Sequence, residues 1–79
     1  MKYDYNICDA ADEAVFYSQC AALEKHIPGL KDEQTLYDVD GSLIRIYAHV
    51  HGGLKIYCDT NVDAVYIKSS FDIDPFFPV

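Results

Sequence analysis

The chain has 79 residues, 51% of them hydrophobic, and its 13 acidic against six basic residues give a formal net charge of −7. This length suits one small domain with a single core, and the hydrophobic content excludes a disordered tail. The acidic balance disfavours nucleic acid or an anionic membrane as a direct ligand and favours a basic protein surface, unless the acid serves only solubility.

The first predicted elements are a strand and a helix. Alternating apolar residues predict a strand over 3–7. Asp9 stands at the expected helix N-cap, and we assign further acid at Asp12 and Glu13 to the positive end of the helix dipole. Pro28-Gly29 ends the helix. Its core-facing stripe follows helical spacing: Phe16, Cys20, Leu23 and Ile27.

After the helix the apolar period changes to two and predicts four strands, over 34–39, 42–50, 54–59 and 64–68. Turn residues separate them: Asp40-Gly41, His51-Gly52-Gly53 and Thr60-Asn61. The predicted fold is α+β, with one amphipathic helix packed on an antiparallel β-meander in two layers and the order β-α-β-β-β-β. Residues 1–79 form one domain, and 70–79 is expected as an extended C-terminal tail.

The register of the strands 42–50 and 54–59 decides which side chains share a face. Even-numbered residues of both strands are expected to face the helix because they are apolar: Ile44, Ile46, Ala48, Val50, Leu54, Ile56 and Cys58. This pairing needs the three-residue loop 51–53, with Gly53 in a left-handed conformation. A two-residue loop is expected to turn Lys55, Tyr57 and Asp59 into the core instead.

His49, His51 and Cys58 lie close enough in sequence to suggest a metal or thiol site. In the expected register His49 lies on the outer face while Cys58 points into the core. A zinc site needs three or four converging ligands, and a catalytic Cys–His pair needs direct contact. We therefore expect no catalytic residue, no metal and no cofactor, with a small metal or thiol enzyme as the least favoured alternative.

Two surfaces are candidates for partner binding. Tyr47, Tyr57 and Tyr66 form a predicted row on the face that no helix covers, which either stabilises the sheet or binds a partner or a second copy. The phenylalanines of the segment 71–79 are an alternative cover for this row. The second surface is an acidic end where two turns meet, suited to the Lys and Arg of a nucleic-acid-binding protein although Asp is also common in turns. Its residues are Asp38, Asp40, Asp59 and Asp63.

The chain resembles the small acidic inhibitors encoded by phages and mobile elements, anti-CRISPR proteins among them. The resemblance rests on its size, its acidity, its three cysteines, which are expected to be reduced thiols, and its pattern of one helix followed by a β-meander. The resemblance covers the whole chain without a motif of any one family, so no functional residues are carried over. It implies a non-enzymatic protein that occupies the nucleic-acid-binding surface of an effector in the cytoplasm (the host's, if phage-encoded). Bacterial immunity proteins against basic toxins share this profile, and a homodimeric structural protein is a further alternative.

Overall fold

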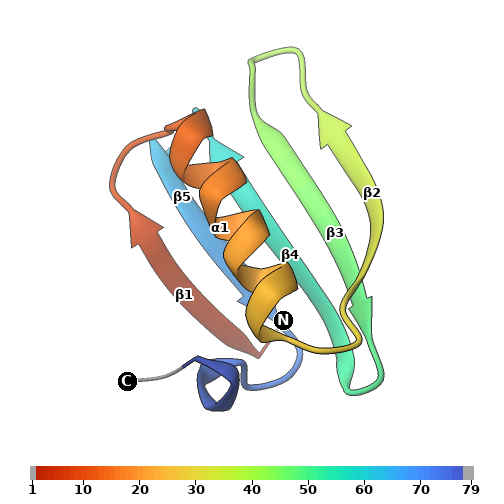
Figure 1. The fold of residues 1–79 in the computed structure, drawn as a ribbon. Helices are drawn as coiled ribbons and strands as arrows, with labels where there is room; N and C mark the ends of the chain where they lie inside the picture. The colour runs from red at the N-terminus through yellow and green to blue at the C-terminus, as the bar shows by residue number, and fades with distance from the viewer. Residues whose placement is uncertain (1, 78–79) are drawn as a thin grey trace.

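A computed structural model describes residues 2–77, and Figure 1 shows how one helix packs on a five-stranded sheet. The elements are β1 (Tyr3–Cys8), α1 (Glu13–His26), β2 (Lys31–Tyr37), β3 (Leu43–His49), β4 (Gly52–Asp59), β5 (Ala64–Ser69) and the short 3₁₀ helix η1 (Asp74–Phe76). Neighbouring strands are antiparallel in the order β1-β5-β4-β3-β2. The predicted two-layer α+β fold is confirmed, with β1 beside β5.

Helix α1 starts later than predicted because Asp12, and not Asp9, is its N-cap. The Asp12 carboxylate accepts hydrogen bonds from the amides of Ala14 (2.9 Å) and Val15 (3.3 Å), two donors that the first turn leaves free. Glu13 is therefore the first helical residue. The predicted apolar stripe is confirmed, since all four members are buried: Phe16, Cys20, Leu23 and Ile27.

The core lies between this stripe and the inner face of β4 and β5. Leu54, Ile56 and Cys58 point inward from β4, as predicted, and all three are buried. On β5, Val65 lies opposite Cys58 and Ile67 lies opposite Ile56, and both β5 residues are buried. These side chains make a continuous apolar cluster with α1.

The face predicted for β3 is wrong. The β3–β4 hairpin closes with a two-residue turn, Val50-His51, so that His49 lies opposite Gly52 and Tyr47 lies opposite Leu54. This turn keeps the even-numbered residues of β4 inward but places the odd-numbered residues of β3 beside them. Tyr47 is consequently buried, whereas Val50 is exposed. The expected three-residue loop 51–53 does not form.

Polar partners explain why β3 adopts this face. Its apolar residues occur on both faces, so hydrophobicity alone does not choose between them. On the inner face the Tyr47 hydroxyl donates to Glu24 (3.0 Å) and Arg45 Nε donates to the Thr35 hydroxyl (3.0 Å). Arg45 also lies 3.9 Å from the Glu24 carboxylate and 3.8 Å from that of Asp32. Both polar side chains are thus satisfied beneath α1.

Gly52, and not Gly53, has the positive φ in this hairpin, at +145°. A Cβ at Gly52 would collide with the Ser70 hydroxyl, because the chain after β5 passes directly over the hairpin. Ser70 is held there by its own amide, which donates to the Gly53 carbonyl (2.9 Å), and by the Gly53 amide, which donates to the Ser70 hydroxyl (2.8 Å). The close approach of the two segments therefore requires glycine.

Residues 70–77 lie at the lower end of the molecule in Figure 1, and their phenylalanines pack against the core. Phe71 is buried and stacks on His49, with ring centroids 4.9 Å apart. Phe77 lies beside His26 at 5.1 Å. The last two residues of the predicted tail, 78–79, lie outside the described residues.

Candidate protein-binding surface

Seven carboxylates gather at one end of the molecule, where the loop before α1 and the β2–β3 and β4–β5 turns meet (Figure 1). The other six acidic residues equal the Lys and Arg in number, so the formal net charge of −7 is concentrated here. Within residues 2–77 none of the seven forms an ion pair, since the two ion pairs involve Glu24 and Asp32. We call this surface the acidic end: Asp9, Asp12, Glu13, Asp38, Asp40, Asp59 and Asp63.

The two turns that carry the predicted acidic residues are in direct contact. Asn61 Nδ2 donates to Asp40 Oδ2 (2.8 Å), and the Thr60 hydroxyl donates to the Asp40 carbonyl (3.2 Å). The Ser42 amide donates to Asp40 Oδ1 (2.9 Å). These hydrogen bonds, that of Ser42 foremost, lower the pKa of Asp40 and keep it ionised. The fold thus holds this charge in a fixed position.

Asp63 joins the start of α1 to the β4–β5 turn. It has a φ of +53°, and its Oδ1 accepts a hydrogen bond from the Ala11 amide (2.8 Å). The acid at the helix start therefore lies on the same surface as the turn aspartates, while Asp12 also caps α1 as described above. Cys58 lies beneath this junction, and its thiol pKa is raised by burial first and then by the charges of four carboxylates: Glu13, Asp12, Asp59 and Asp63.

Two of the three tyrosines predicted to form a row share a face. Tyr57 and Tyr66 stack with ring centroids 4.7 Å apart and an interplanar angle of 11°. Tyr47 lies on the other face, with only 1% of its surface exposed, because β3 has the opposite face to the one predicted. Ile44 lies opposite Tyr57 in its place. The face that α1 leaves uncovered, called the open face below, therefore has a mixed aliphatic and aromatic centre: Leu36, Ile44, Ile46, Tyr57 and Tyr66.

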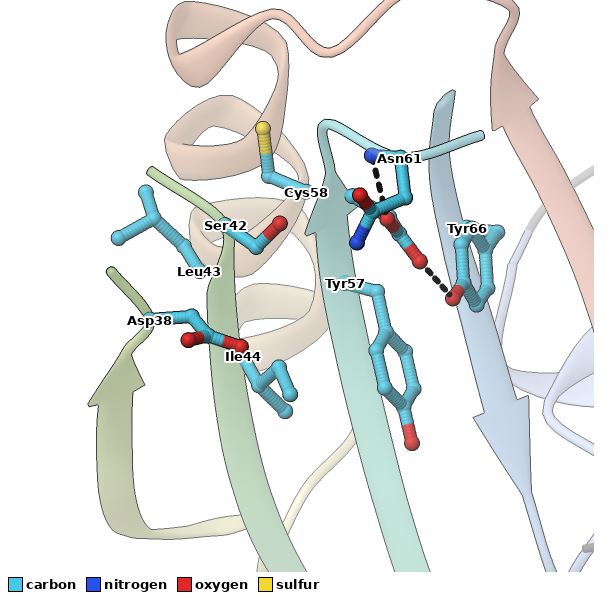
Figure 2. A pocket seen from close by; sticks show the side chains of 9 residues that line it. Asp38, Ser42, Leu43, Ile44, Tyr57, Cys58, Asn61 and Tyr66 are labelled. Carbon is cyan, nitrogen blue, oxygen red and sulfur yellow. Dashed lines mark hydrogen bonds between the residues drawn. The ribbon is translucent and has the colours of Figure 1, made fainter. Parts of the chain in front are cut away.

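A shallow hollow of about 120 Å³ lies where the open face meets the acidic end (Figure 2). Ile44, Tyr57 and Tyr66 contribute to its apolar lining, and Asp38 and Asp59 line it as well. The Tyr66 hydroxyl donates to Asp59 Oδ2 (2.9 Å); burial, followed by this carboxylate, raises the pKa of Tyr66 to about 12. An apolar floor beside carboxylates suits a Lys or Arg side chain, which has an apolar stem and a cationic head.

The histidines lie at the opposite end, together with Lys55 and Lys68. His49 lies on the inner face and not on the outer face as predicted. Its Nε2 donates to the Pro28 carbonyl (2.9 Å), and its Nδ1 accepts from the His51 amide (3.2 Å). Residues 2–77 hold no group of three or more His, Cys, Asp or Glu side chains arranged to bind a metal. The motif that suggested a metal or thiol site is a hairpin.

The sequence reading missed the contribution of the helix start to the acidic end. The signal was available, because α1 and each later strand reverse direction, which places Glu13 at the same end as the β2–β3 turn. It also missed the cluster of Arg45 with Glu24 and Asp32, whose members are far apart in the chain and follow no local pattern.

Comparison of the chain with protein-family models, with curated proteins and with solved structures finds no match. In the described part of the chain, no helix has the length and apolar character needed to cross a membrane.

Proposed function

We propose that this chain is a non-enzymatic, anti-CRISPR-like inhibitor that occupies a basic surface of a nucleic-acid-handling effector in the cytoplasm. The observation that carries the proposal is the segregation of charge, with seven carboxylates at one end and none of them in an ion pair within residues 2–77. Lys and Arg side chains that bind phosphates are the natural counterparts of such a surface. The three cysteines of the chain are free thiols, which suits a reducing compartment.

The fixed positions of the carboxylates support this proposal. Asp40, Asp59 and Asp63 each accept a hydrogen bond from a backbone amide, at 2.8–2.9 Å. An ionised carboxylate has about four acceptor sites, so each keeps capacity for a cationic partner. Because the charges are positioned before binding, a partner does not need to order them, and less entropy is lost on association.

The experiment that tests the proposal compares two charge-reversed double variants as immobilised baits. Glu13→Lys/Asp38→Lys changes the acidic end at carboxylates outside the hydrogen bonds that join the turns; Asp38 bonds to the adjacent Val39 amide (2.7 Å). Asp4→Lys/Asp74→Lys makes the same charge change away from the acidic end. We expect the native chain and the control to capture the same basic protein from cell lysate, and the acidic-end variant to lose it.

The captured protein is then mixed with a labelled nucleic acid and increasing amounts of the native chain, and the bound fraction is measured by electrophoretic mobility. Displacement of the nucleic acid supports inhibition by occupation of the basic surface. Equal capture by both double variants, or a captured protein that keeps its nucleic acid, would contradict the proposal. Capture of a basic toxin in place of an effector would identify the chain as an immunity protein that uses the same end.

A homodimer is the second candidate, because the open face exposes apolar side chains on a sheet face that no helix within residues 2–77 covers. An aromatic and aliphatic centre of this kind is common in protein interfaces. Under this alternative Tyr57→Ser weakens self-association more than it weakens folding, as measured by sedimentation and by urea unfolding. An unchanged oligomeric state would leave Tyr57 and Tyr66 as a pair that stabilises the sheet.

A further inference from the structure

β2 is a free edge of the sheet. It is the outermost strand beside β3, most of its residues are exposed, and α1 lies over the middle strands to one side of it (Figure 1). The other edge strand, β1, is bonded near its start to the C-terminal segment: Tyr5 donates to Asp72 (2.9 Å) and accepts from the Ile73 amide (3.2 Å). An edge strand presents a row of unpaired N–H and C=O groups, so β2 can accept one more strand.

A bulge divides β2 into two unequal halves. The register with β3 shifts between Asp32 and Gln34. Lys31 and Asp32 before this shift and Glu33 within it are all charged. Bulges and charged side chains are devices that protect an edge from pairing with another copy of the chain. From Gln34 to Tyr37 the pairing with β3 is regular. This second half is the part of the edge that remains open to a further strand.

Apolar side chains and carboxylates occur together beside the second half of β2. Leu36, Tyr37 and Val39 are three of the six large hydrophobic residues exposed on residues 2–77, so exposed apolar surface is concentrated here. A hollow of about 280 Å³ adjoins the strand, lined by Leu36, Tyr37 and Ile44 with Asp38 at its wall. A strand added at this edge would therefore meet apolar surface next to negative charge.

We propose that the second half of β2 binds an extended, basic segment of the partner as an additional strand. Side chains alternate between the two faces of a strand, so the partner residue facing Leu36 would be apolar and the one two positions away, facing Asp38, would be basic. Backbone hydrogen bonds supply affinity in this mode of binding, and the alternate side chains supply specificity. The inference rests on the proposed function and states how the basic partner docks.

The test uses the full chain and a short synthetic peptide in which valine and arginine lie two positions apart, so that both face the same side of the added strand. We expect the peptide to slow amide hydrogen exchange selectively over 34–38. A matched peptide with N-methylated valines has the same charge and side chains but cannot complete a ladder, and we expect it to bind about tenfold more weakly, since one lost net hydrogen bond of about 1.4 kcal/mol has that effect. A peptide with glutamate in place of arginine is the charge control.

Two protein variants localise the site. Leu36→Lys places a charge on the edge, and we expect it to reduce peptide binding several-fold. Val62→Lys makes the same charge change at an exposed position of the β4–β5 turn, and we expect it to bind like the native chain. Circular dichroism confirms that both variants are folded.

Equal binding of the N-methylated peptide, or protection mapped to 59–63 in place of 34–38, would overturn the edge inference while leaving the acidic-end proposal intact. The edge inference would also be wrong if the peptide failed to bind while capture of a basic protein still depended on Glu13 and Asp38. The acidic-end proposal would again remain intact. Protected β2 amides in a peptide-free dimer would show that a second copy occupies the edge.

Discussion

The two faces of the sheet have similar apolar content on β3, yet only one of them is in the core. Leu43 and Tyr47 point toward α1 and are buried, whereas Ile44 and Ile46 point away from it and remain partly exposed. On the buried face the Tyr47 hydroxyl bonds to Glu24 and Arg45 bonds to Thr35, and the two-residue turn at Val50-His51 sets the register that places them there. Hydrophobicity places β3 in the sheet; its polar groups and its turn choose the face.

The two faces should differ most in how much the free energy of unfolding falls when an aliphatic side chain is truncated to alanine. Leu54 on the inner face is 0% exposed, so Leu54→Ala should lower the free energy of unfolding by about 2–5 kcal/mol through lost burial and a residual cavity. Ile46→Ala on the open face should cost less than about 1.5 kcal/mol, because its side chain is already partly hydrated. Urea unfolding measures both, and equal costs would show that a partner or second copy covers the open face.

Gly52→Ala tests the turn that sets the face of β3. The new Cβ would meet the Ser70 hydroxyl at a φ that side-chain-bearing residues avoid, and we expect a loss of about 1–3 kcal/mol. Val50→Ala in the same hairpin is the control and should be within about 0.5 kcal/mol of the native chain, because Val50 is exposed. A neutral Gly52→Ala would mean that the hairpin has another conformation.

A pair of tyrosines compares the polar requirements of the two faces. Tyr47→Phe removes the hydroxyl that bonds to Glu24, and we expect a loss of about 0.5–1.5 kcal/mol in thermal or urea unfolding. Tyr57→Phe on the open face should be close to neutral, because within residues 2–77 its hydroxyl has no hydrogen-bond partner. If both changes are neutral, the Tyr47 hydroxyl does not help to select the face of β3.

The smallest effect concerns the ionisation of Tyr66. Its pKa is raised from 10.0 to about 12 by burial and then by Asp59, so the folded state favours the protonated phenol. This contribution to stability is complete below pH 10 and is lost as the pH rises toward 12. Asp59→Asn should lower the pKa of Tyr66 only part of the way to 10.0, since burial is the larger cause, and tyrosinate absorbance measures the shift. No change in that titration would mean that Asp59 does not contact Tyr66 in solution.

Elements with a clear apolar period could be predicted from the sequence, as the stripe from Phe16 to Ile27 shows. The strand expected over 34–39 instead spans Lys31–Tyr37, because its charged first residues follow no apolar period. The face of β3 could not, since apolar residues follow both alternations and Arg45 finds Glu24 and Asp32 only after the chain has folded. The four turn aspartates were brought together as expected because hairpin topology places both turns at one end. Tyr47 was predicted to lie in the tyrosine row because β3 was assigned the wrong face, and it is instead buried under α1.

The concentration of charge at one end gives the molecule a pronounced electric dipole. At physiological ionic strength the Debye length is about 8 Å, shorter than any dimension of this 32 × 26 × 22 Å molecule. A basic body near the acidic end therefore experiences a strongly anionic object, whereas one near the other end experiences a nearly neutral object. The resulting torque rotates the molecule during approach, so orientation is selected before any side chains touch and fewer encounters are wasted.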